Sequence, residues 1–280
     1  MITLIRNEFY KQKREWSFLF LLLLSLLPVL TGGAGAIFNN STKTLADLFF
    51  FMNNQFAMFF PMVLFILVGF LFYQEYKNKT YINWITYGYS KRKLFFTKVS
   101  VALIIGVLFA AILLLLFICL IFALKVTGKV SADIPELLTV SGGFLLEAAI
   151  IIPVTVCAGA IIINLSRNII ISSVIGVIYG FASCFFIGSE IGFVVPNGFA
   201  YRVAMYFSDR TSYYDNPIRA TIGGCVISLL IFAILLSVGV ILFTHKIYVT
   251  QKTLCSKFNL LHMIQNISVL PSLLLPFLLI

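Results

Sequence analysis

Charged residues are scarce in this sequence. They make up 11% of its 280 residues, whereas 61% are apolar and the mean hydropathy is +1.05. Because an ordinary soluble domain carries about 25% charged residues, this composition excludes an ordinary soluble protein. It indicates an integral membrane protein.

Cysteine and histidine chemistry is also sparse. The five cysteines form no CxxC pair and four of them lie inside apolar runs, so we interpret them as small hydrophobic residues. The two histidines, His245 and His262, lie near the end of the last apolar run and in the C-terminal tail. These residues predict neither a metal site nor a disulfide.

Motifs for enzyme chemistry are missing as well. The sequence has no G-x-x-x-x-G-K-[ST] phosphate loop, no H-E-x-x-H, no G-x-S-x-G and no paired carboxylates in an apolar run. The chain is therefore expected to be no enzyme, to hold no cofactor and to leave any ATP hydrolysis to another protein.

What the sequence does contain is long apolar runs. Six of them are long enough to cross about 30 Å of hydrocarbon as helices. They lie near residues 16–38, 51–73, 99–124, 143–163, 169–187 and 221–244. The sequence therefore predicts an all-α integral membrane protein with six transmembrane helices.

The last crossing divides the chain into two regions. Residues 1–250 are expected to form the transmembrane domain, and 251–280 an apolar C-terminal tail. Because Pro271 and Pro276 disfavour a regular seventh crossing, we expect this tail to be interfacial or loosely packed, although a true crossing is the alternative.

The distribution of lysine and arginine predicts the orientation. With the N-terminus in the cytoplasm, 14 basic residues face the cytoplasm and 6 face outward. The positive-inside rule therefore favours a cytoplasmic N-terminus. The net charge of +10 follows from this topology, and no nucleic-acid partner is expected.

The N-terminal segment 1–15 has helical spacing. Ile2, Ile5 and Phe9 would form an apolar face, and Arg6 and Lys11 belong to the basic one. This pattern predicts an amphipathic helix lying in the membrane interface. The alternative is a frayed basic tail.

The segment 74–98 is a charged and aromatic island between the second and third apolar runs. It contains six basic residues, and Glu75 is its only acidic one. Ser90 is expected to cap a helix whose first turn is basic, although basic residues there oppose the helix dipole. A bound partner or acidic lipid headgroups would offset that cost. The basic residues of this turn are Lys91, Arg92 and Lys93.

Polar residues inside apolar runs are candidates for a substrate path. Asn53, Asn54 and Gln55 stand at or just inside the outer boundary of the second run, and Glu147 lies about one turn inside the fourth. Two alternatives remain open. The amides would cap a helix in the headgroup layer, and Glu147 would snorkel to water from a shallow position.

The outer segment 188–219 is apolar at first and rich in tyrosine later. It predicts broken apolar helices that dip back from the outer surface, with aromatic residues at headgroup level. The short turn 164–168 on the opposite side is either a second contact for a cytoplasmic partner or a plain reverse turn.

This organisation resembles the permease subunits of ABC type-2 transporters over about residues 1–250. In that family a Glu ends the second span, a short helix on the ATPase follows, and a Ser-basic pair and a Lys open the third. Glu75, Ser90–Lys91 and Lys98 occupy these places. Asn78 and Thr86–Tyr87 stand where the family often has a Gly and a Leu-Pro pair.

The resemblance implies a permease subunit of an ATP-driven exporter in the bacterial cell membrane. Its cargo would be amphipathic or hydrophobic, such as a peptide toxin, a bacteriocin, a drug or a lipid-like molecule. Its partners would be two copies of a separate ATPase, which binds ATP and Mg²⁺, a second permease, identical or homologous, and the lipid bilayer.

The resemblance also implies a cytoplasmic coupling helix between spans two and three and re-entrant outer helices between spans five and six. Coupling to the ATPase would involve Glu75, Tyr89, Ser90, Lys91, Arg92 and Lys93. The alternative function is a non-transporting scaffold or sensor subunit that docks a cytoplasmic partner through the basic loop.

Overall fold

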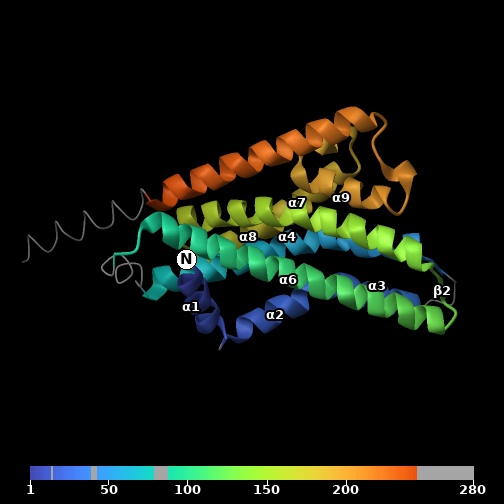
Figure 1. Cartoon of the computed structure of the whole chain (residues 1–280), viewed down its shortest axis with the longest axis horizontal. Coiled ribbons are helices and arrows are strands. Elements are labelled where there is room, and N and C mark those ends of the chain that lie inside the picture. The colour runs from blue at the N-terminus through green and yellow to red at the C-terminus, as the bar shows by residue number, and fades with distance from the viewer. Residues whose placement is uncertain (14, 39–42, 79–87, 245–280) are drawn as a thin grey trace, which may run out of the picture.

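The computed structural model describes residues 1–13, 15–38, 43–78 and 88–244. Five of its helices are long and apolar enough to cross a membrane, and they run side by side along the long axis of the molecule (Figure 1). They are α4 (Leu45–Asn78), α6 (Lys91–Val126), α7 (Ile134–Ser166), α8 (Ile169–Ile187) and the helix Pro217–Thr244.

The predicted first span is a bent pair of helices, α2 (Trp16–Ser25) and α3 (Leu27–Phe38). Their axes differ by 45°. The bend lies just before Pro28, whose ring clashes with the carbonyl one turn earlier and whose nitrogen cannot donate to it. Counted as one span, the pair brings the candidate crossings to six.

Three of the helices, α4, α6 and α7, extend well beyond the predicted spans. α4 begins at Leu45 rather than near residue 51, and α7 begins at Ile134 rather than near residue 143. Acidic residues in the first turns, Asp47 and Glu136, favour these helix starts because they complement the dipole. Hydropathy marks the end of an apolar run, not the end of a helix.

The N-terminal helix α1 (Ile2–Gln12) forms as predicted, so the alternative prediction of a frayed tail is wrong. Its inward face, however, is not the apolar one. Leu4, Glu8 and Gln12 are buried, whereas Ile2 and Phe9 are exposed. This face turns inward because Glu8 finds cationic partners on the neighbouring helices, described below.

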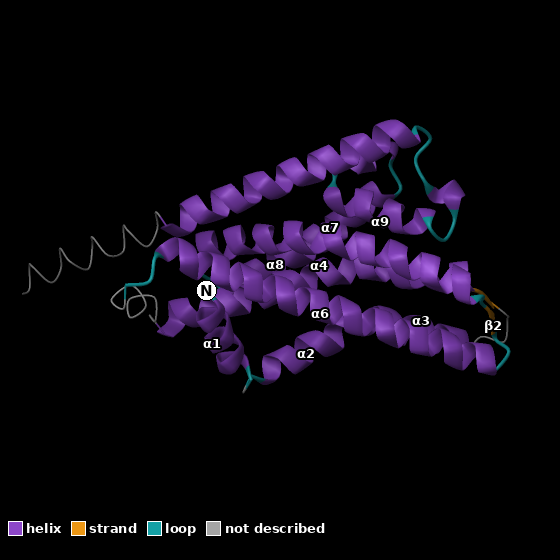
Figure 2. Ribbon diagram, in the orientation of Figure 1, coloured by secondary structure: helices purple, strands orange, loops and turns teal. Residues whose placement is uncertain are grey.

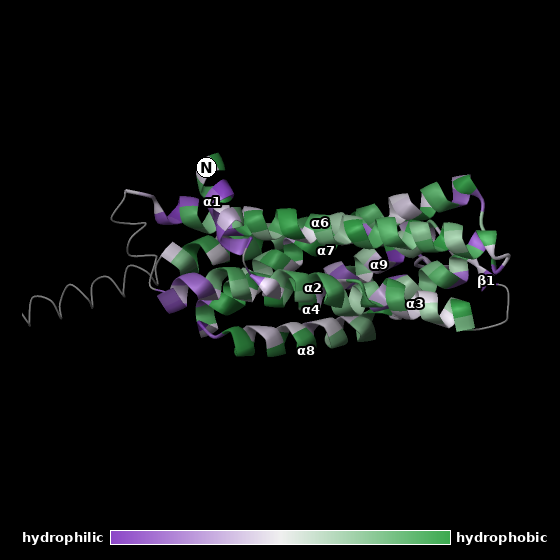
Figure 3. Ribbon diagram, turned by 90° about the horizontal axis from the view of Figure 1, so that it is seen from below, coloured by the Kyte–Doolittle hydropathy of each residue, from purple (hydrophilic) through white to green (hydrophobic). Residues whose placement is uncertain are grey.

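The bundle has two distinct ends (Figure 2). Helix α1 lies at one, which we call the α1 end. At the other, the strand end, β1 (Lys43–Thr44) pairs in parallel with β2 (Val130–Ser131). Hydrophilic residues gather toward both ends and hydrophobic ones fill the length between them (Figure 3). This banding is the one expected of a membrane-spanning bundle.

Short helices follow α8 at the strand end, in the segment predicted to contain broken helices. They are η1 (Glu190–Val194), α9 (Pro196–Tyr206) and η2 (Arg210–Ser212). Nine of the eleven residues of α9 are buried, and it packs mainly on α7. Whether these helices re-enter the membrane stays a prediction. The predicted tail lies outside the described residues.

Helix α4 is the centre of the bundle, packed on both α7 and α8. Its contact with α8 is unusually close because α8 presents glycine there. A Cβ atom on Gly176 would lie 2.4 Å from the Cβ of Phe65, and one on Gly180 would lie 2.4 Å from the carbonyl oxygen of Met58. Small residues allow such approach between membrane helices.

We expect Gly180→Ala to lower the thermal unfolding midpoint in detergent, because its methyl group collides with backbone and overpacking costs about 1–3 kcal/mol. Gly142→Ala in α7 is the matched control, since a Cβ there meets nothing within 4 Å. Both changes gain the same helix propensity. Equal midpoints for the two variants would contradict the close packing of α8 on α4.

Candidate functional site

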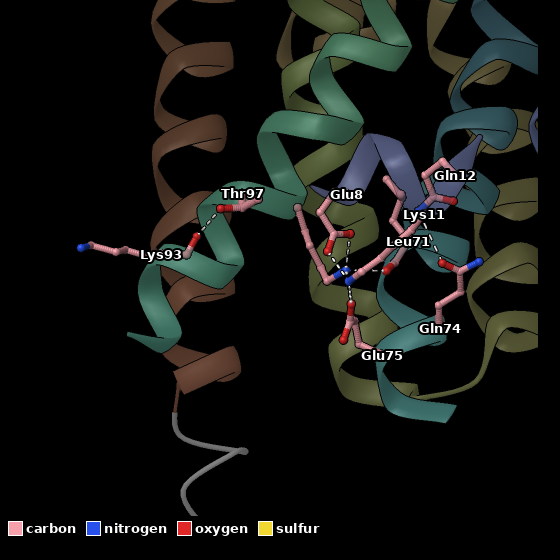
Figure 4. Close-up of polar contacts among 9 residues, drawn as sticks. Glu8, Lys11, Gln12, Leu71, Gln74, Glu75, Lys93 and Thr97 are labelled. Carbon is pink, nitrogen blue, oxygen red and sulfur yellow. Dashed lines mark hydrogen bonds and ion pairs between the residues drawn. The ribbon is translucent and has the colours of Figure 1, made fainter. Parts of the chain in front are cut away.

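A cluster of four charged side chains joins three helices at the α1 end (Figure 4). Glu8 and Lys11 come from α1, Glu75 from the last turn of α4 and Lys98 from α6. Lys11 Nζ lies 2.8 Å from Glu8 Oε1 and 2.7 Å from Glu75 Oε1. We call these four residues the charge cluster.

Lys98 is the most enclosed cation of the charge cluster, with 4% of the residue exposed. Its Nζ donates to Glu8 Oε2 at 2.9 Å, to the carbonyl oxygen of Leu71 at 2.9 Å and to Glu75 Oε1 at 3.4 Å. An ammonium has three donors. All three are therefore used inside the protein, two of them on carboxylates from different helices.

The charge cluster is balanced, with two carboxylates and two ammonium groups. Removing one partner from such a buried set is costly because the remaining charge is left uncompensated. Burial alone would lower the pKa of Lys11, but its hydrogen bonds to Glu75 and Glu8 outweigh this and raise that pKa. Lys11 is therefore charged at neutral pH, and it ties α1 to α4.

Glu75 pairs with Lys11 and Lys98, and its expected role in holding the loop against the base of the spans stays a prediction. Sequence reasoning missed two other members of the charge cluster. Glu8 and Lys11 stand three residues apart, the spacing of an ion pair on one helix face. An acidic residue three positions before a lysine, in a segment rich in basic residues, was the available signal.

The basic turn predicted after Ser90 is the first turn of α6 itself. Ser90 is the N-cap, and its Oγ accepts from the backbone nitrogen of Lys93 at 3.4 Å. Tyr89, Arg92 and Lys93 are exposed, and the Lys93 side chain points away from the charge cluster (Figure 4). A separate coupling helix would fall on residues 79–87, outside the described part of the chain.

The turn between α7 and α8 is tied to α4 by its own contacts. The Tyr76 hydroxyl donates to Asn164 Oδ1, and the Arg167 guanidinium lies 5.7 Å from the centre of the Tyr76 ring. Arg167 adopts a left-handed conformation, with φ of 51°, which ends α7. Asn164 thus packs inside the bundle, while Arg167 stays exposed.

The predicted substrate-path residues separate into two groups. Asn53 and Glu147 are brought together between α4 and α7, and both are fully buried, with 0% exposed. Asn54 is exposed, and Gln55 accepts a hydrogen bond from Thr31 at 2.6 Å.

Both alternatives for these residues are wrong. The amides do not cap α4, because Asn53 lies eight residues after its start, or about 12 Å along the axis. Glu147 lies thirteen residues into α7, about 20 Å from its start. It has no exposed surface and so does not snorkel to water.

Sequence reasoning also missed two polar residues of α9 near this place, Asn197 and Tyr201, which are 1% and 5% exposed. They stand in a short helix after a proline, in a segment whose packing partners no local pattern reveals. The part of the chain that the structure describes contains no group of three or more His, Cys, Asp and Glu residues able to hold a metal ion.

A protein-family model described as an ABC-2 family transporter protein matches residues 4–183. That range holds the whole charge cluster, Asn53 and Glu147, and it ends within α8. No curated protein and no solved structure matches the chain.

We expect Lys98→Met to lower the free energy of unfolding by about 3–5 kcal/mol, because Glu8 and Glu75 then share only Lys11. Lys93→Met, which removes an exposed lysine five residues earlier, is the control and should change stability by less than about 0.5 kcal/mol. Thermal unfolding and purified yield in detergent measure both. Equal losses in the two variants would contradict the structural role of the charge cluster.

Proposed function

Because the chain belongs to the ABC-2 transporter family, we propose that it is the permease subunit of an ATP-driven exporter. Members of this family typically work with an ABC ATPase. The candidate crossings and the family together make this chain a multi-pass membrane protein. The proposal assigns ATP and Mg²⁺ to two copies of a separate ATPase and adds a second permease, identical or homologous.

The observation that supports coupling most directly is the position of the exposed basic turn on α6. Ser90 begins a helix that continues without a break through Lys98, about 12 Å further along. Through Lys98 that helix is bonded to Glu8 on α1 and to Glu75 on α4. A push on the first turn of α6 therefore acts on three helices together.

The basic turn is also suited to an acidic partner. Lys91, Arg92 and Lys93 oppose the positive end of the helix dipole and are tolerated at a cost of a few tenths of a kcal/mol each. An acidic surface on the ATPase would recover that cost. The proposal therefore places the α1 end in the cytoplasm of a bacterial cell, in agreement with the positive-inside rule.

For cargo, we propose an amphipathic or hydrophobic molecule, such as a peptide toxin, a bacteriocin, a drug or a lipid-like compound. The bundle is apolar along its length, and its enclosed polar residues are few (Figure 3). Asn53 and Glu147 are the buried polar residues proposed for the cargo path. Asn54 and Gln55, also proposed for it, lie nearer the surface of the bundle.

We expect Arg92→Glu/Lys93→Glu to weaken ATPase binding and to uncouple hydrolysis from transport. Folding should be preserved, because glutamates are favourable in a first helical turn. Co-purification with the ATPase and cargo-stimulated hydrolysis in the complex are the measurements. Arg210→Glu/Arg219→Glu makes the same charge change on two exposed arginines beyond α9 and should leave ATPase binding unchanged.

Two results would overturn this function. One is full cargo-stimulated hydrolysis in the Arg92→Glu/Lys93→Glu complex. The other is labelling of Lys93 from outside intact cells, since the proposed docking surface would then face the wrong side of the membrane.

A further inference from the structure

Several buried polar atoms of the strand-end half have no hydrogen-bond partner in the described part of the chain. They are both carboxylate oxygens of Glu147, both amide atoms of Asn53 and the amide oxygen of Asn197. Buried polar groups are normally hydrogen-bonded, and an isolated buried carboxylate is especially costly. The other unpartnered atoms are one amide oxygen and four hydroxyls, whereas these three residues leave a carboxyl group and amide groups without partners, which a ligand would satisfy.

The contacts of these residues place them around one point between α4, α7 and α9. The Asn53 amide approaches the Glu147 carboxyl without reaching full hydrogen-bond geometry, and Glu147 also lies near Tyr201. Tyr201 lies one helical turn from Asn197, which donates from Nδ2 to the carbonyl oxygen of Ala57 at 3.4 Å. Ala57 lies one turn from Asn53 on α4. Asn197 therefore contacts α4 close to Asn53, and the four residues are neighbours.

The structure shows no ion pair to Glu147 within the described residues. The basic residue of α9, Arg202, is engaged elsewhere. Its Nε donates to the carbonyl oxygen of Ile187 at 2.9 Å, its Nη1 lies 3.2 Å from Glu190, and its guanidinium lies 4.5 Å from the centre of the Tyr214 ring. Any cation that pairs with an ionised Glu147 therefore has to come from outside the described residues.

We propose that Glu147, Asn53, Asn197 and Tyr201 form a binding site for a primary ammonium group of the cargo. An ammonium has three donors and no acceptor. The site offers it a carboxylate and two unpartnered amide oxygens, with the buried Tyr201 beside the carboxylate. A single carboxylate matches a single charge, whereas a divalent ion is usually held by several carboxylate and carbonyl oxygens.

The surroundings of the site suit the apolar part of an amphipathic amine. Phe56 follows Asn53 by three residues, Phe144 precedes Glu147 by three, and their ring centres are 4.6 Å apart. The site is closed in this conformation, because Glu147 and Asn53 have no exposed surface. An ammonium group therefore enters when α4, α7 and α9 separate during transport. This entry step rests on the proposed permease function, and the ammonium site specifies the chemical class of the cargo.

The test uses the full chain in lipid nanodiscs without ATPase, with dodecylamine as the probe and dodecanol as its uncharged counterpart. We expect dodecylamine, but not dodecanol, to raise the thermal unfolding midpoint in a saturable way. Glu147→Gln should weaken the apparent affinity for dodecylamine about tenfold or more. Glu136→Gln, which changes an exposed carboxylate of the same helix, should bind like the unchanged chain.

Asn53→Leu supplies a second variant with every carboxylate intact, and we expect it to weaken dodecylamine binding as well. Equal binding by Glu147→Gln and the unchanged chain, no saturable effect of dodecylamine, or the same effect from dodecanol would overturn the site. Stabilisation by Na⁺ alone that Glu147→Gln abolishes would overturn the cargo ammonium in favour of an inorganic cation. Because neither ATPase nor transport enters the assay, these outcomes are independent of the coupling experiments.

Discussion

A charge buried in an apolar bundle needs a partner, and this requirement organises the α1 end of the protein. Lys98 meets it with two carboxylates and one backbone carbonyl, and Lys11 bridges the same two carboxylates. The result joins an N-terminal helix to two long helices that are distant in sequence. The same requirement explains why α1 turns a glutamate inward and leaves Ile2 and Phe9 exposed.

The strand-end half of the bundle leaves the requirement unmet. Glu147 is at least as deeply enclosed as Glu8, Glu75 and Lys98, yet no basic side chain of the described residues pairs with it. Two amides beside it are also incompletely bonded. The charge cluster is therefore complete within the protein, whereas Glu147 leaves room for a ligand that carries a positive charge. This division underlies the proposals that the subunit receives work at the α1 end and holds cargo toward the strand end.

Helix α4 is common to both regions. It holds Glu75 in its last turn and Asn53 about 33 Å away along the same axis. Its packing against α8 leaves no room even for a methyl group at Gly180, and its phenylalanines pack against α7.

The sequence by itself determined the membrane class, since the apolar runs are long enough to span and too poor in charge for water. It also determined the capped start of α6, because Ser90 needs only the backbone nitrogen of Lys93 nearby. Only the tertiary structure decided which charges meet, because Glu8 and Lys98 are ninety residues apart and pair solely through helix packing. It likewise decided that Asn53 and Glu147 are fully buried inside the bundle, well past the starts of α4 and α7. It also decided that α9 packs on α7, because no local pattern encodes contacts between distant segments.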